Sequence, residues 1–125
     1  MWHMWYTSLM SDIETDYVIG ILDANGRLFA SGRNGLKVMV RATPEVHAWL
    51  KSKFRGGFDR GRYVCAGRNH AYTLIAWWEA NTAARSIELE AALAVWDTAP
   101  DSVARGKALA RWERVRSTYD PIEED

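Results

Sequence analysis

Two short segments in which apolar and polar residues alternate constrain the fold of this chain most. They cover residues 27–31 and 36–41, and the turn-forming sequence Gly32-Arg33-Asn34-Gly35 separates them. A period of two is typical of β-strands, and a glycine-rich connection of this kind favours a hairpin. One face of the hairpin would be core, with Leu28, Ala30, Leu36, Val38 and Val40. The other face would carry Arg27, Phe29, Ser31, Lys37, Met39 and Arg41.

A capped helix is predicted before this hairpin. The sequence Ser11-Asp12-Ile13-Glu14 fits a capping box, in which the Ser11 hydroxyl and the Glu14 carboxylate each accept from a free amide at the helix start. The helix would run to about Ala24. Gly26 would then take the left-handed conformation that ends many helices.

A second helix and a second hairpin are predicted to follow. Thr43-Pro44-Glu45 supplies a cap, a first-turn proline and a first-turn acid, and the helix would end at Gly56-Gly57. Residues 58–65 and 71–78 can form a hairpin around the loop between them. The apolar segment 71–78 can instead begin a helix, because periodicity does not separate the two readings.

The rest of the chain completes one α+β domain of 125 residues. Helices are expected over about residues 83–97 and after Ser102. An aromatic extension, residues 1–10, precedes the domain core, and residues 118–125 form a frayed acidic tail. This length suffices for one hydrophobic core and is too short for two.

Charge is distributed unevenly although the net charge is zero. Residues 1–26 carry four acids and no bases, residues 27–68 carry ten bases and two acids for a net charge of +8, and residues 69–125 carry a net charge of −4. A basic segment of this kind suits phosphate binding by counterion release. The simpler interpretation is a solvated basic face without a partner.

Several classes of protein are disfavoured by composition. An apolar run long enough to span a membrane is absent from the sequence, and its start lacks the pattern of a signal peptide, so we expect a soluble, cytoplasmic protein. Cys65 is the only cysteine, which excludes an internal disulfide and a cysteine-rich zinc site. We expect Cys65 to be a small buried apolar residue.

The segment Val18-Ile19-Gly20-Ile21-Leu22-Asp23-Ala24-Asn25-Gly26 resembles the LAGLIDADG motif of homing endonucleases. It is identical at the third, sixth, seventh and ninth positions and apolar at the first, second, fourth and fifth. The resemblance extends more weakly through residues 41–57 and covers roughly residues 17–97. It implies an αββαββα fold with a four-stranded antiparallel DNA-binding sheet, followed here by C-terminal helices.

The resemblance also implies a homodimer that grips a long pseudo-palindromic DNA duplex. In family members with one motif, the motif helix packs on its own copy, so the implied interface residues are Val18, Ile19, Gly20, Leu22 and Asp23. Gly20 suits a close approach of two backbones. The basic and amide side chains expected to contact DNA are Arg27, Arg33, Asn34, Lys37, Arg41, Arg60, Arg62 and Arg68.

Catalysis by the family depends on the eighth position of the motif, where an acid binds Mg²⁺. That position is Asn25 here, which offers one neutral carbonyl oxygen where the metal prefers charged oxygen ligands. The candidate catalytic residues are therefore Asn25, as the metal position, Asp23, and Arg85 as the counterpart of a basic residue near the scissile phosphate.

Three functional hypotheses remain open from the sequence. The first is a Mg²⁺-dependent DNA endonuclease that tolerates Asn25. The second is a catalytically silent scaffold that acts as a DNA-binding regulator or a maturase-like binder of intron RNA. The third is a protein-interaction module without nucleic acid, in which the basic segment is a solvated surface.

Overall fold

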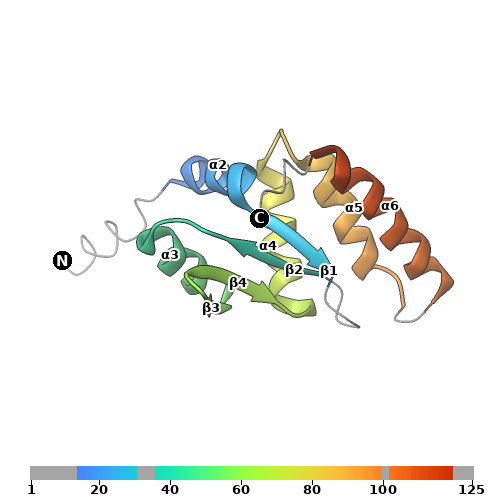
Figure 1. Ribbon diagram of the computed structural model, residues 1–125, viewed down its shortest axis with the longest axis horizontal. Coiled ribbons are helices and arrows are strands. Elements are labelled where there is room, and N and C mark those ends of the chain that lie inside the picture. The colour runs from blue at the N-terminus through green and yellow to red at the C-terminus, as the bar shows by residue number, and fades with distance from the viewer. Residues whose placement is uncertain (1–13, 31–35, 100–101, 120–125) are drawn as a thin grey trace.

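The computed structural model describes residues 14–30, 36–99 and 102–119. Over these residues the chain is an α+β structure with a four-stranded antiparallel sheet and five helices, compatible with an αββαββα arrangement (Figure 1). In chain order the elements are α2 (Thr15–Asn25), β1 (Arg27–Ala30), β2 (Leu36–Val40), α3 (Pro44–Phe54), β3 (Gly57–Asp59), β4 (Arg62–Ala66), α4 (Arg68–Asn81), α5 (Ser86–Trp96) and α6 (Val103–Tyr119).

The first predicted hairpin is confirmed. Strands β1 and β2 pair antiparallel, with Leu28 opposite Val38 and Phe29 opposite Lys37. The sheet order is β1-β2-β4-β3, so β2 and β4 are central and their pairing joins the two hairpins. The turn expected at residues 32–35 lies outside the described residues.

The second hairpin does not pair residues 58–65 with residues 71–78: β3 and β4 form it within residues 57–66, and residues 71–78 lie inside α4, which is the helical alternative for that segment. Strands β3 and β4 are joined by Arg60 and Gly61, whose φ angles are 56° and 80°. Two successive residues with positive φ suit a tight hairpin turn whose twist matches that of the strands. The loop expected around residues 66–69 instead leads into α4 through Gly67.

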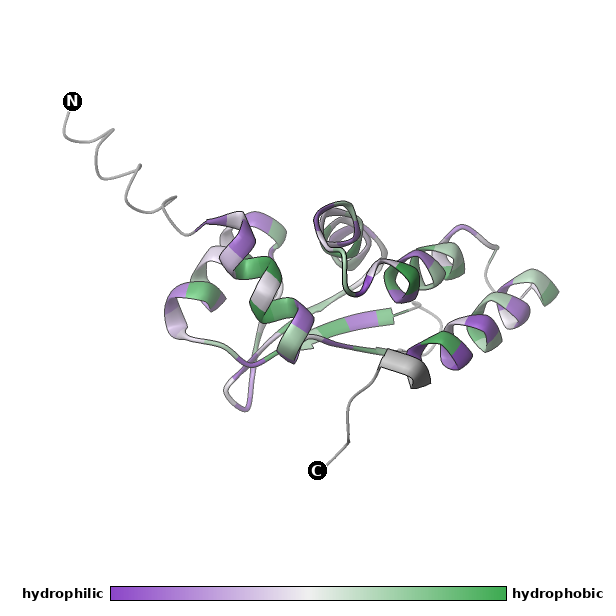
Figure 2. Ribbon diagram, turned by 90° about the horizontal axis from the view of Figure 1, so that it is seen from above, coloured by the Kyte–Doolittle hydropathy of each residue, from purple (hydrophilic) through white to green (hydrophobic). Residues whose placement is uncertain are grey.

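The helices cover one face of the sheet and leave the other face largely open. Buried side chains of β1, β2 and β4 face α2, α3 and α4: Leu28, Leu36, Val38, Val40, Tyr63 and Cys65. Trp78, Trp96 and Trp112 join α4, α5 and α6 in the same core. Figure 1 shows the strands in front of α4, and Figure 2 shows both hydrophobic and hydrophilic residues on each helix, as expected for helices with one buried face.

The ends of α2 differ from the prediction. Glu14, in extended backbone, is the N-cap residue, and the rest of the expected capping box lies outside the described residues. Gly26 is not left-handed, since its φ is −73° and its ψ is 138°. Its need for glycine comes from packing, because a Cβ atom there would lie 2.6 Å from the Leu22 carbonyl oxygen and 2.8 Å from the Trp78 ring.

Two polar core residues on β4 stabilise the end of α3. The Tyr63 hydroxyl lies 2.6 Å from the Arg55 carbonyl oxygen and donates to it, and the Cys65 thiol donates to the carbonyl of Phe54 at 3.6 Å. Burial raises the pKa of both groups, so each stays protonated at neutral pH. Cys65 is fully buried, which confirms the expected small apolar role.

Candidate nucleic-acid interface

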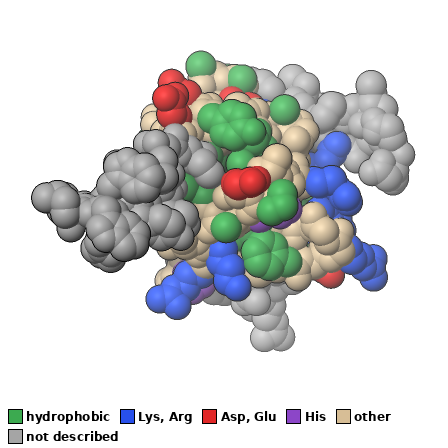
Figure 3. Space-filling view, turned by 90° about the vertical axis from the view of Figure 1, so that its left-hand side faces the viewer, with side chains coloured by type: hydrophobic (Ala, Val, Ile, Leu, Met, Phe, Trp, Pro, Cys, Tyr) green, Lys and Arg blue, Asp and Glu red, His purple; other side chains and the backbone are tan. Residues whose placement is uncertain are grey.

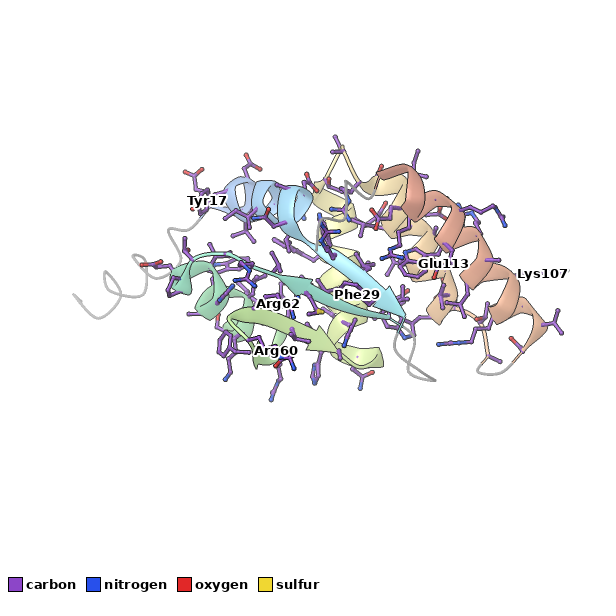
Figure 4. All side chains as sticks on the ribbon, viewed as in Figure 1. Tyr17, Phe29, Arg60, Arg62, Lys107 and Glu113 are labelled. Carbon is purple, nitrogen blue, oxygen red and sulfur yellow. The ribbon has the colours of Figure 1, made fainter. Side chains whose placement is uncertain are left out.

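The open face of the sheet is basic because of strand alternation. Leu28, Val38 and Tyr63 point into the core, so their strand neighbours point to the other side. We call this side the open face; its residues are Arg27, Phe29, Lys37, Met39, Arg41, Arg62 and Val64. Figure 4 shows where Phe29 and Arg62 lie on the strands. Arg60 is exposed in the neighbouring β3–β4 turn.

A hollow of about 260 Å³ lies on the open face at the end of α2. We call it the arginine hollow, and its polar lining residues are Asn25, Arg27, Arg41 and Arg62. The Asn25 side-chain nitrogen donates to the Arg41 carbonyl oxygen at 3.2 Å, which fixes the amide at the rim. Phe29 and Met39 form an apolar part of the lining. The structure thus brings Asn25 together with three of the basic residues expected to contact DNA.

Three of the expected contact residues cannot be placed in this surface. Arg33 and Asn34 lie outside the described residues. Arg68 begins α4, and its side chain is also outside the description. The described part of the expected set is therefore Arg27, Lys37, Arg41, Arg60 and Arg62.

Asp23 is placed away from the arginine hollow, at the junction of α2 and α4. One carboxylate oxygen accepts from the Trp78 indole nitrogen at 2.9 Å and from the Thr82 hydroxyl at 2.8 Å. The second oxygen lies 3.0 Å from the same hydroxyl. These partners connect the end of the motif helix to the end of α4, and they engage both oxygens of the carboxylate.

Arg85 is buried beneath the C-terminal end of α2. Its guanidinium donates to the carbonyl oxygens of Asp23 and Gly26, at 3.0 Å each. The same group forms an ion pair with Glu88 at 2.7 Å and lies 5.1 Å from the centre of the Trp78 ring. A cation at a helix C-terminus stabilises the unpaired carbonyls and the helix dipole. Arg85 therefore occupies a structural position in the described chain.

The motif helix exposes Gly20 but buries three other residues named for the dimer interface. Val18 and Leu22 are fully buried and Ile19 is 6% exposed, so all three pack inside the protomer. Gly20 is exposed with open space above its Cα. Tyr17 and Ala24 are exposed on the same side of the helix, three residues before and four residues after Gly20.

Helix α6 adds one residue to the open face that sequence reasoning missed. The guanidinium of Arg116 lies 5.7 Å from the centre of the Phe29 ring and 5.3 Å from that of Trp112. Arg116 also forms an ion pair with Glu113 at 3.4 Å. The contact places the C-terminal part of α6 beside β1, and no local pattern in the sequence signals it.

The residues of the arginine hollow do not fit a divalent cation. Mg²⁺ binds through oxygen ligands, usually with carboxylates among them. As far as the chain is described, the lining supplies three guanidinium groups and one neutral amide, and no carboxylate. Over the described part of the chain, no group of three or more His, Cys, Asp or Glu residues is arranged to hold a metal ion.

A second, more apolar hollow lies beside α3 and adjoins the arginine hollow, because Ala42 and Gly61 in its lining are the chain neighbours of Arg41 and Arg62. Pro44, His47, Ala48 and Phe58 contribute to its lining. Phe58 is 54% exposed, and the Lys51 ammonium lies 5.3 Å from the centre of its ring. Figure 3 shows hydrophobic side chains exposed between Lys and Arg side chains at this end of the molecule. The Nε2 atom of His47 accepts from the Ala42 backbone at 2.9 Å, which gives this histidine a structural role.

Two comparisons with known proteins were negative for this chain. No family model matches it, and no curated protein matches it. Among the described residues, the helices are all too short or too polar to cross a membrane.

Proposed function

We propose that this protein binds duplex DNA through the open face of its sheet. The observation that carries the proposal is the grouping of Arg27, Lys37, Arg41 and Arg62 on the one sheet face that the helices leave uncovered. A basic segment that is only solvated would not have to gather its side chains on one surface. Phosphate contacts by several Lys and Arg side chains supply most of the affinity of DNA-binding proteins.

The shape of this face supports DNA as the partner. An antiparallel β-ribbon fits the major groove, which is about 12 Å wide. Lys37 and Met39 alternate with buried residues along β2, so they present side chains outward at every second position. Arg and Lys side chains in this arrangement can contact guanine edges as well as phosphates.

The size of one sheet favours recognition by two copies. The longest strands contain five residues, which corresponds to about 17 Å and therefore to half a turn of DNA. A twofold copy would extend the surface over two half-sites of a pseudo-palindrome. We propose that the exposed side of α2, with Tyr17, Gly20 and Ala24, forms this homodimer contact on the LAGLIDADG-like scaffold.

The proposed activity is binding without metal-dependent cleavage. Asn25 lacks the charge that a magnesium ligand needs, and the Asp23 carboxylate is engaged by Trp78 and Thr82. Arg85 holds the end of α2 and is buried. The protein therefore fits the silent-scaffold hypothesis better than that of a homing endonuclease.

Salt-dependent binding of a random duplex of about 30 base pairs, about three helical turns, tests this proposal. We expect the natural protein to bind, and Lys37→Ala with Arg41→Ala to weaken binding and reduce the salt slope by about two. Lys53→Ala with Lys107→Ala removes the same charge from exposed positions on α3 and α6 and is the matched control. Equal losses in both double variants would contradict the open face as the contact surface. Stronger binding of a structured RNA than of DNA would assign the same face to RNA.

A further inference from the structure

We infer that the arginine hollow is a phosphate site, and that it takes an anion where the motif resemblance implies a metal cation. The inference deepens the proposed function, since a backbone phosphate of DNA would be the ligand. It rests on three observations about the hollow: its charge, an unpaired donor of Arg62, and the chemistry of Asn25.

The charge of the hollow is the first observation. Arg27, Arg41 and Arg62 line it together, and no acid is among its lining residues in the described ranges. Like charges repel one another, so gathering three guanidinium groups favours a ligand that brings negative charge. A phosphate oxygen supplies that charge, and the planar guanidinium group binds phosphate with two parallel hydrogen bonds.

The second observation is a buried hydrogen-bond donor. The Nε atom of Arg62 is buried, and no acceptor for it is found within the described parts of the chain. Buried polar groups nearly always have a partner, and an unpaired one in a hollow points to a missing ligand. An oxygen atom bound beside Arg62 would accept from this donor after a small turn of the side chain, because the atom is shielded from solvent in the unliganded protein.

The third observation concerns Asn25 and the apolar side of the hollow. An acid at position 25 would repel an anion and would pair with the neighbouring arginines, whereas the neutral amide does neither. The amide donates to the carbonyl of Arg41 and so supports the residue that carries one of the guanidinium groups. Phe29 and Met39 suit contact with the sugar carbons attached to a backbone phosphate.

A titration with inorganic phosphate tests the inference without DNA. The arginine Nε–H signals of the natural protein would be recorded by ¹H–¹⁵N NMR, with chloride holding the ionic strength constant. We expect the Arg62 signal to move and saturate while that of Arg111, which is paired with Glu90 on the helical side, stays in place. Arg62→Lys keeps the charge and removes the Nε–H group, and it should weaken phosphate binding about tenfold.

Arg111→Lys keeps the pairing with Glu90 possible, is the matched control and should bind phosphate as the natural protein does. An Arg62 signal that moves no further than that of Arg111, or full phosphate affinity in folded Arg62→Lys, would overturn the inference. Duplex DNA is titrated in parallel. Binding of DNA with the Arg62 signal unmoved overturns the inference and keeps the proposed function. Saturable phosphate binding without DNA binding overturns the proposed function and keeps the phosphate site. It identifies free phosphate or a phosphate monoester as the ligand.

Discussion

Arg85 and Glu88 form an ion pair inside the protein, with side chains that are 9% and 2% exposed. The guanidinium also donates to two backbone carbonyls at the end of α2. Ions buried in this way are stabilised by their partners, so loss of one partner leaves the other without compensation. The pair thus links α5 to the motif helix and to the strand that follows it.

Arg85→Met should destabilise the protein by about 3–5 kcal/mol, because it leaves the Glu88 carboxylate buried and unpaired. Adding Glu88→Leu should recover part of this loss, since the double variant has no buried charge at the site. Urea unfolding of the two variants measures both effects. If the unfolding free energy of Arg85→Met lay within about 1 kcal/mol of that of the natural protein, the ion pair would not be the stabilising contact.

The Cys65 thiol should resist modification in the folded protein. It is fully buried, and burial raises its pKa, so the reactive thiolate is scarce even above pH 8.5, about the ordinary pKa of a thiol. Reaction with a chromogenic disulfide reagent at pH 7 and pH 9 should be slow at both values and become fast in urea. A native rate that rises between these pH values as strongly as the unfolded rate would contradict the burial of this group.

At the scale of the elements, two glycines of the motif segment differ in the space around them for a larger side chain. Gly26 lies against the Leu22 carbonyl and the Trp78 ring, whereas Gly20 faces open space. Two glycines of one motif therefore have different physical roles. The first serves packing between α2 and α4, and the second is free for a contact outside the protomer.

Gly26→Ala should destabilise the protein by about 1–3 kcal/mol, because its Cβ atom would meet backbone and ring atoms at 2.6 and 2.8 Å. Gly20→Ala should stabilise the isolated protomer by about 0.5–1 kcal/mol, as alanine does inside a helix. Thermal unfolding at low protein concentration compares the two. Similar effects of the two variants would refute this assignment of their roles.

The elements also show what the sequence predicts and what it leaves open. The hairpin of β1 and β2 follows from alternation, and the start of α3 follows from Thr43, whose hydroxyl accepts from the Val46 amide. The partner of the second hairpin could not be fixed because residues 71–78 are mostly apolar, and an apolar segment of this length fits a buried strand as well as a buried helix. The basic face was predictable from the alternation, but the capping position of Arg85 depends on contacts 59 residues apart.

At the scale of the molecule, the two faces of the sheet differ in what covers them. Basic side chains gather on the open face, and the other face of the sheet is covered by helices. One copy offers only a short contact surface for DNA. We therefore propose that a second copy associates with it through the exposed side of α2. A dimer of this kind would place two open faces along one duplex.

Gly20→Leu should reduce dimer formation, because a large side chain would separate helices that meet at Tyr17, Gly20 and Ala24. Glu90→Ala, at an exposed position on α5, is the control. Sedimentation velocity over a range of concentrations measures the dimer fraction with and without DNA. Natural protein that stays monomeric at every concentration, also on DNA, would contradict the dimer.

Backbone amide NMR during titration with a duplex of about 30 base pairs locates the DNA contact on the protein. We expect shifts in β1, β2 and β4 around Arg27, Lys37 and Arg62, with α5 unchanged. Shifts confined to the end of the molecule near His47 and Phe58, or no shifts at all, would contradict binding of DNA by the open face.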